Sequence, residues 1–309
     1  MHPQKLNAKI NILPTQLVKL EYSFLKKHQI TLYVKRIDMI HPYISGNKWF
    51  KLFYNLQEAT RQNIKTLLTF GGAYSNHIYA TAAAGKEFGF KTIGIIRGEE
   101  YLPLNPTLQF AKECGMKIFY INRTKYRNKK DPAFILKLKD KFGDFYLLPE
   151  GGNNILAVKG CFEIIKSINV NFNYICTPCG TGGTLAGLIC GLNKNQEALG
   201  FSTLKGGGFL VGDIMKLIKN YNDNEYNNWS LMLDYHFGGY AKINDELISF
   251  IKKFDKEFKI PLEPIYTGKM FYGIFDLIKK GYFSKKSTII ALHTGGLQGL
   301  LGMKGKIKN

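Results

Sequence analysis

The sequence predicts an α/β fold in which mainly parallel sheets are covered by helices, and three observations support this prediction. The chain has 309 residues, which is enough for two domains or one large domain. Its 45% hydrophobic and 21% charged residues, with 22 Phe and 18 Tyr, are typical of a folded globular protein. Short β-rich runs alternate with helix-like stretches along the chain, as they do in βαβ units.

The predicted strands are short runs of β-branched, aromatic and aliphatic residues, and the predicted helices are the longer stretches between them. The first helix is amphipathic, and the second begins at Ser75, a residue suited to capping a helix. The strands cover residues 66–70, 91–96, 117–121, 145–148, 174–177 and 287–292, and the helices include 49–62, 75–88, 106–114, 154–167, 184–192 and 269–280.

The net charge of +20 would attract polyanions, so nucleic acid and an anionic membrane are partners to consider. The excess is nearly all lysine, which is spread along the chain with one modest cluster at residues 123–130. Arginine, whose planar group recognises guanine and phosphate, occurs only five times. These features favour a soluble enzyme that binds no nucleic acid, and a basic nucleic-acid-binding protein stays as the remote alternative.

The five cysteines form an odd and sparse set, which favours a reducing cytoplasm over a disulfide framework. Cys176 and Cys179 have the spacing of a redox or metal pair, but no histidine is spaced as a further ligand. We therefore expect no metal and interpret Cys176 as the end of a buried strand. The longest uncharged apolar stretch, 287–303, is too short for a membrane span, so no membrane association is expected.

Three glycine-rich turns each follow a predicted strand directly: residues 71–77, 178–184 and 293–296. In open parallel sheets, ligands bind beyond the carboxyl ends of the strands, where such turns gather. The candidate chemistry of this chain is therefore expected at these turns.

The turn 178–184 offers unhindered backbone N–H groups and the hydroxyls of Thr181 and Thr184 at the start of a helix. The positive end of a helix attracts a phosphate. The turn lacks the Lys of a P-loop, and Leu185 stands where a dinucleotide fingerprint needs a small residue. A single phosphate fits this turn better than a pyrophosphate, and a purely structural glycine loop is the alternative.

The turn 71–77 places Asn76 and His77 in the first turn of a helix, where a carboxylate can bind. The small residues of 80–85 suggest close packing against another element or a cofactor. A nucleophilic Ser75 is disfavoured because the chain contains no Gly-x-Ser-x-Gly motif.

Lys48 is the only Lys, Arg or acidic residue between residues 40 and 50, and it precedes the apolar face of a helix. A desolvated lysine has a lowered pKa and can act as the neutral amine that Schiff-base chemistry requires. A lysine of this kind, a phosphate turn and a carboxylate turn together imply pyridoxal phosphate.

Seven segments across nearly the whole chain also resemble, in order and spacing, the motifs of one family. They are 35–38 (KRID), 45–52 (SGNKWFKL), 75–77 (SNH), 149–153 (PEGGN), 180–187 (GTGGTLAG), 264–269 (PIYTGK) and 293–296 (HTGG). The chain resembles the 1-aminocyclopropane-1-carboxylate deaminase and D-cysteine desulfhydrase branch of the tryptophan-synthase-β-like, fold-type-II pyridoxal-phosphate enzymes.

This resemblance implies two domains, each an open, mainly parallel, twisted sheet flanked by helices. Residues 1–47 and 160–309 are expected to form the large cofactor-binding domain, and residues 48–159 the small domain with the Ser-Asn-His turn. A homodimer is expected from the frequency of symmetric dimers among soluble proteins.

The resemblance also implies roles for individual residues. Lys48 would form the internal aldimine with the cofactor, and Thr294 would meet its pyridine nitrogen. Asn76 would lie near the cofactor's phenolic oxygen. The substrate carboxylate would bind Ser75, Asn76 and His77, the active-site tyrosines would be Tyr240 and Tyr266, and the cofactor phosphate would bind Gly180, Thr181, Gly182, Gly183 and Thr184.

Two positions bear on the substrate in this family. Deaminases usually carry Glu after the second tyrosine and Leu before the last Gly-Gly, whereas the D-cysteine enzymes carry Thr at the second position and no acid at the first. This chain has Thr267 and Thr294 and so resembles the desulfhydrases. It departs from the family at Tyr74 and Tyr79, where Gln and Arg are frequent.

The expected reaction is therefore α,β-elimination from a small D-amino acid, with D-cysteine giving pyruvate, ammonia and sulfide. Lys48 is the candidate base, and Tyr266 would assist protonation of the leaving group. Deamination of 1-aminocyclopropane-1-carboxylate to 2-oxobutyrate and ammonia is the close alternative.

Overall fold

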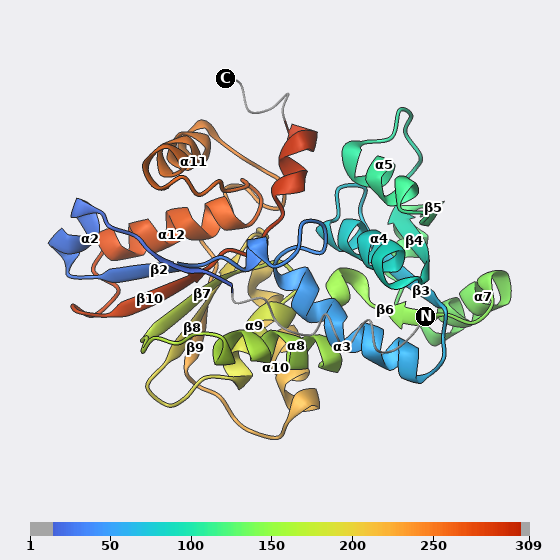
Figure 1. Ribbon diagram of the computed structural model, residues 1–309, viewed down its shortest axis with the longest axis horizontal. Coiled ribbons are helices and arrows are strands. Elements are labelled where there is room, and N and C mark those ends of the chain that lie inside the picture. Colours follow the sequence, from blue (N-terminus) through green and yellow to red (C-terminus); the bar gives the residue numbers. More distant parts are fainter. Residues whose placement is uncertain (1–14, 304–309) are drawn as a thin grey trace.

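The structure is a computed structural model that describes residues 15–303, with side chains up to residue 300. Two sheets form its framework, and helices cover both faces of each (Figure 1). The α/β class and the mainly parallel sheets predicted from the sequence are therefore confirmed. Within residues 15–303, no helix combines the length and the apolarity that crossing a membrane requires.

The larger sheet has the strand order β1-β2-β10-β7-β8-β9 in the described part of the chain. All neighbouring strands are parallel except β1, which is antiparallel to β2. The strands are β1 (Leu17–Lys19), β2 (Thr31–Lys35), β7 (Tyr174–Cys179), β8 (Glu197–Ser202), β9 (Trp229–Met232) and β10 (Thr288–Leu292).

Successive residues of a strand point to opposite faces of the sheet, and β7 shows this in the core. Ile175 packs in one apolar cluster, and Cys176 packs in the other on the opposite face. Cys176 therefore lies inside a buried strand and not at its end, because β7 continues to Cys179. One face is covered by α8 (Ile155–Lys166), α9 (Gly183–Cys190) and α10 (Leu210–Tyr221), and the other by α2 (Ser23–His28), α11 (Asp245–Phe258) and α12 (Thr267–Lys279).

The smaller sheet is fully parallel, with the order β5-β4-β3-β6 among the described residues. Leu67 and Leu68 on its β3 strand enter separate apolar clusters on the two faces. The strands are β3 (Thr66–Gly71), β4 (Lys91–Arg97), β5 (Lys117–Ile121) and β6 (Tyr146–Leu148), and the helices around them are α3 (Asn47–Arg61), α4 (Asn76–Phe88), α5 (Pro106–Glu113), α6 (Arg123–Arg127) and α7 (Pro132–Phe142).

The six strands predicted from the sequence correspond to β3, β4, β5, β6, β7 and β10, whereas β1, β2, β8 and β9 were missed. The β8 sequence contains Glu197, Ala198 and Gly200, which have low strand propensity. Its pairing with β7 and β9 stabilises this strand.

The two-domain division, 1–47 with 160–309 and 48–159, stays a prediction. All strands of the smaller sheet fall within 48–159, and all strands of the larger sheet fall outside that range. Residues 1–14 and 304–309 of the predicted large domain lie outside the described residues.

Two glycines allow the helices between the sheets to pack closely. A Cβ atom on Gly160 of α8 would lie 1.8 Å from the Phe50 carbonyl oxygen on α3. A Cβ on Gly187 of α9 would lie 2.4 Å from the Cys161 Cβ on α8. Since real Cβ atoms do not tolerate such distances, glycine is required at both contacts. This packing brings the first turns of α3 and α9 toward each other.

Candidate active site

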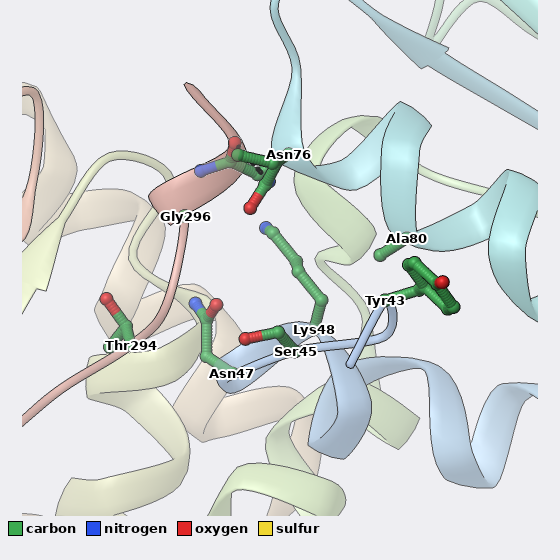
Figure 2. Close-up of a pocket in the computed structure, with 9 residues that line it drawn as sticks. Tyr43, Ser45, Asn47, Lys48, Asn76, Ala80, Thr294 and Gly296 are labelled. Atoms are coloured by element: carbon green, nitrogen blue, oxygen red, sulfur yellow. Dashed lines mark hydrogen bonds between the residues drawn. The ribbon is translucent and has the colours of Figure 1, made fainter. Parts of the chain in front are cut away.

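A small cavity, partly open to solvent, lies where α3 begins and where β3 and β10 end (Figure 2). The side chain of Lys48 extends into it toward Asn76, which comes from the first turn of α4 (Figure 2). The lining residues are Tyr43, Ser45, Asn47, Lys48, Asn76, Ala80, Thr294, Gly296 and Gln298. Of the residues predicted from the sequence, the cavity thus brings together Lys48, Asn76 and Thr294.

Lys48 is placed by the close approach of two loops. Gly46, just before α3, has φ +65°, and a Cβ there would lie 1.9 Å from the Thr294 carbonyl oxygen. Only glycine combines this conformation with this contact. The start of α3 is therefore held against the turn that follows β10.

The ammonium group of Lys48 lies in a desolvated, positively charged environment. Its Nζ donates to the Gly151 carbonyl oxygen at 3.1 Å. Burial lowers the pKa of Lys48 well below its ordinary value, and the neighbouring charge of Lys51 lowers it further. Both effects favour the neutral amine, which is the form that can attack a carbonyl carbon.

The turn 180–184 leads into α9, whose first residue is Gly183. Asn47 Nδ2 donates to Thr184 Oγ1 at 2.8 Å, which ties this turn to the start of α3. The hydroxyl of Thr181 donates to Asn153 Oδ1 at 3.2 Å. The N–H groups of the first turn of a helix have no partner within the helix, so the start of α9 suits an anion.

Lys51 is a second cation at this turn, and the sequence analysis missed it. Its buried Nζ donates to Asn153 Oδ1 at 2.7 Å and to the Gly151 carbonyl at 3.3 Å. A Cβ on Gly183 would lie 3.1 Å from this Nζ, so the ammonium group faces the start of α9. The sequence signal was its spacing of three residues from Lys48, which puts both lysines on one side of a helix.

The three side chains of the Ser-Asn-His turn, Ser75, Asn76 and His77, occupy different environments. Ser75 Oγ accepts from the backbone N–H groups of His77 and Ile78 at 3.2 and 3.3 Å and so caps α4. His77 is buried, and burial together with Lys48 and Lys51 lowers its pKa well below the ordinary value. Among the three, only Asn76 lines the cavity.

Gln298 is another cavity residue that the sequence analysis missed. It lies on the short helix η4 (Leu297–Met303), which packs near α5 (Figure 1). Its Nε2 donates to Asn76 Oδ1 at 2.7 Å. The contact orients the Asn76 amide, and only its place directly after the HTGG segment could have indicated it.

Tyr240 and Tyr266 form an aromatic pair with ring centroids 6.0 Å apart at an interplanar angle of 68°. A Cβ on Gly180 would lie 3.0 Å from Tyr266 Cε1, so the Tyr266 ring packs against the turn 180–184. Burial and the neighbouring Tyr240 raise the pKa of Tyr266 well above its ordinary value. Its phenol therefore keeps its proton and can donate it.

Thr267 is fully buried and does not line the cavity. Its hydroxyl donates to the Glu263 carboxylate at 3.1 Å and accepts from the Glu263 backbone N–H at 3.1 Å. The same carboxylate accepts from the backbone N–H groups of Ile265, Tyr266 and Thr267. Hydrogen bonds therefore hold the Glu263 carboxylate at the start of α12.

The residues present fit pyridoxal phosphate on structural grounds. The turn 180–183 needs its three glycines, because Cβ atoms there would lie 2.2–3.0 Å from Tyr266, Ile214 and Asn153, and Lys51 supplies a positive charge beside this turn. Lys48 supplies the amine, and Thr294 and Asn76 supply polar groups for the ring. Residues 15–303 contain no group of three or more His, Cys, Asp and Glu side chains that could hold a metal ion.

We expect the double substitution Thr181→Val and Thr184→Val to weaken cofactor retention. Each hydroxyl that contacts the phosphate would contribute at least about 1 kcal/mol, or roughly fivefold in the dissociation constant. Dialysis followed by absorbance of the retained cofactor measures this. Unchanged retention would place the phosphate elsewhere.

The chain is similar over most of its length to several known proteins. The family model for pyridoxal-phosphate-dependent enzymes matches residues 9–295. A Pyrococcus furiosus protein with the provisional name 1-aminocyclopropane-1-carboxylate deaminase is 33% identical, over 89% of this chain and 88% of its own length. An Arabidopsis thaliana protein named bifunctional D-cysteine desulfhydrase/1-aminocyclopropane-1-carboxylate deaminase, mitochondrial, is 29% identical over 87% of this chain and 73% of its own. A crystal structure titled as a homologue of the same deaminase superimposes with a TM-score of 0.86 at 29% identity, covering 99% of both chains.

Proposed function

The chain belongs to the family of pyridoxal-phosphate-dependent enzymes, and we propose that within it the protein eliminates sulfide from D-cysteine, releasing pyruvate and ammonia. Its cofactor is pyridoxal 5'-phosphate, and the enzymes of its branch act on small amino acids. The identity of the substrate, D-cysteine, is our proposal.

The observation that carries this proposal is the hydroxyl of Thr294 in a cavity whose lining, among the described residues, includes no carboxylate. A hydroxyl can share a hydrogen bond with an unprotonated pyridine nitrogen, whereas a carboxylate would favour protonation and a stronger electron sink. The carboxylate of Glu263 is engaged at the start of α12. Loss of a good thiolate leaving group needs less carbanion stabilisation than opening a cyclopropane ring.

In the proposed reaction, Lys48 removes the Cα proton, because its lowered pKa makes a neutral amine accessible. Bound pyridoxal phosphate supplies the electron sink for the charge left at Cα. Tyr266, which keeps its proton because its pKa is raised, donates toward the leaving sulfur with Tyr240 beside it. Thr181, Thr184, Lys51 and the start of α9 would hold the phosphate.

The substrate carboxylate is proposed to bind at the Ser-Asn-His turn. Asn76 lines the cavity and supplies its amide, which Gln298 orients. Ser75 and His77 would contribute through the start of α4 that they form, where backbone N–H groups favour an anion. Thr267 would act from behind the cavity by fixing Glu263.

Deamination of 1-aminocyclopropane-1-carboxylate is the second candidate, and the names of the related proteins favour it. It would use the same lysine and cofactor. It differs in the bond broken, which is a ring C–C bond and not a C–S bond.

Incubating the holoenzyme separately with D-cysteine, L-cysteine, D-serine and 1-aminocyclopropane-1-carboxylate tests the proposal. We expect sulfide and pyruvate in equal amounts from D-cysteine, and little 2-oxobutyrate from the cyclopropane substrate. Efficient 2-oxobutyrate formation with no sulfide from D-cysteine would contradict the proposed substrate. The assignment of the cofactor would survive that result.

A homodimer and a cytoplasmic location remain proposals that light scattering and cell fractionation can test. We interpret the excess of lysine as solvated side chains on the surface of an enzyme, and not as a nucleic-acid-binding surface.

A further inference from the structure

The segment between β9 and α11, residues 233–244, carries Tyr240 and has a strained backbone. Phe237 and Ala241 have φ values of +50° and +56°, and Gly238 and Gly239 between them have +89° and +121°. Left-handed conformations are uncommon for residues other than glycine and persist only when the surrounding structure enforces them. Something must therefore hold this segment in place.

Lys269, in the first turn of α12, makes the contacts that hold it. Its side chain is fully buried, and its Nζ donates to the carbonyl oxygens of His236 and Gly239, each at 2.8 Å. The His236 carbonyl lies just before Phe237, the first residue with positive φ, and the Gly239 carbonyl belongs to the peptide bond that leads into Tyr240. One ammonium group thus fixes both sides of the turn.

The position of this charge is energetically unfavourable, which argues for a specific use. A buried cation loses its hydration, and the start of a helix is the positive end of the helix dipole. Burial lowers the pKa of Lys269 to about 8, while the nearby carboxylate of Glu263 opposes that shift. The ammonium form therefore prevails at neutral pH.

Tyr266 directly precedes the helix that carries Lys269, so the same helix start places both members of the tyrosine pair. The Tyr240 ring packs edge-on against Tyr266, although Tyr240 as a whole residue remains 43% exposed. We propose that Lys269 is a positioning residue that holds Tyr240 against Tyr266, which rests on the role proposed above for the two tyrosines. Without Lys269, the turn would relax and Tyr240 would leave its partner.

Lys35 provides a matched control within the same chain. It is also buried, and its Nζ also donates to two carbonyl oxygens, those of Thr15 and Ser167, at 3.0 and 2.8 Å. Neither carbonyl belongs to a segment that carries an active-site tyrosine. A general loss of stability should follow from Lys35→Met and Lys269→Met alike, whereas a loss of positioning should follow only from the second.

The kinetic test compares holoenzymes of Lys269→Met, Lys35→Met, Tyr240→Phe and the double variant Lys269→Met/Tyr240→Phe. The substrate is whichever of D-cysteine and 1-aminocyclopropane-1-carboxylate the unmodified protein turns over. We expect Lys269→Met to lower kcat by about 10- to 100-fold with a smaller change in KM, and Lys35→Met to leave kcat nearly unchanged. The double variant should be no slower than the slower single variant, because both changes remove the same positioned group.

Hydrogen exchange of residues 233–244 gives a readout that does not depend on the reaction. Lys269→Met should accelerate exchange in this segment, whereas Lys35→Met should not. Lys269→Gln, which keeps a shorter donor, serves if Lys269→Met fails to fold, and it should show the same pattern in weaker form. Unchanged exchange in the folded variant, or effects of Lys269→Met and Tyr240→Phe that simply multiply, would overturn the proposal. If neither substrate is turned over, the proposed function is wrong, and the exchange result still decides whether Lys269 holds the segment.

Discussion

Replacing Lys48 with alanine should lower turnover by about 10⁴-fold and remove the visible absorption band of the lysine-bound cofactor. The side chain is expected both to hold the cofactor covalently and to move the Cα proton, and general base catalysis alone is worth about 10²- to 10⁴-fold. Assay of the purified variant with added cofactor, together with an absorbance scan, measures both effects.

The fold should survive this change, because the Lys48 side chain extends into the cavity and is not part of the apolar core (Figure 2). Circular dichroism and the melting temperature check this. Lys27→Ala, at an exposed lysine on α2, is the control and should leave turnover and spectrum unchanged. Turnover retained by the Lys48→Ala variant would show that the amine is not required.

Replacing Lys51 with methionine should weaken binding of pyridoxal phosphate by about 10- to 150-fold. Hydrogen bonds to charged groups contribute about 1.5–3 kcal/mol, and this ammonium group faces the start of α9, where the phosphate is expected. Fluorescence or absorbance titration of the apoprotein gives the dissociation constant. The free energy of unfolding of the apoprotein should fall by less than the free energy of cofactor binding. Removing the Lys51 charge relieves its repulsion with Lys48, which is seen in the lowered pKa of Lys48.

Pyridoxal, which has the same ring and aldehyde but no phosphate, is the control for this variant. Its affinity should be nearly the same for Lys51→Met and the unmodified protein. Equal losses for both compounds would mean that Lys51 supports the cavity in general and does not contact the phosphate.

The parts of the fold and site that the sequence predicted are those encoded locally. Glycine-rich turns at the ends of apolar strands predicted where the site would lie, because parallel strands place their carboxyl ends at one edge. Lys48 stood out because it is the only charged residue between 40 and 50, and it does line the cavity. Asn76 and Thr294 line the same cavity from turns that were predicted.

The parts that escaped prediction depend on contacts between distant segments. Lys51, Gln298 and Lys269 act through partners that are 102, 222 and about 30 residues away in sequence. The only local signals are the spacing of Lys51 from Lys48 and the place of Gln298 after the HTGG segment, and neither reveals these partners. Thr267 shows a different limit: its partner Glu263 is only four residues away, but the local sequence does not reveal that the hydroxyl contacts Glu263 and not the cavity.

Locating the lysine that holds the cofactor tests the central claim of this account most directly. Borohydride reduction of the holoenzyme makes the bond between lysine and cofactor permanent, and peptide mapping by mass spectrometry then identifies the modified residue. We predict a single modification at Lys48. Modification of Lys51, which is also buried with a lowered pKa, or of another lysine with Lys48 unmodified, would contradict the account.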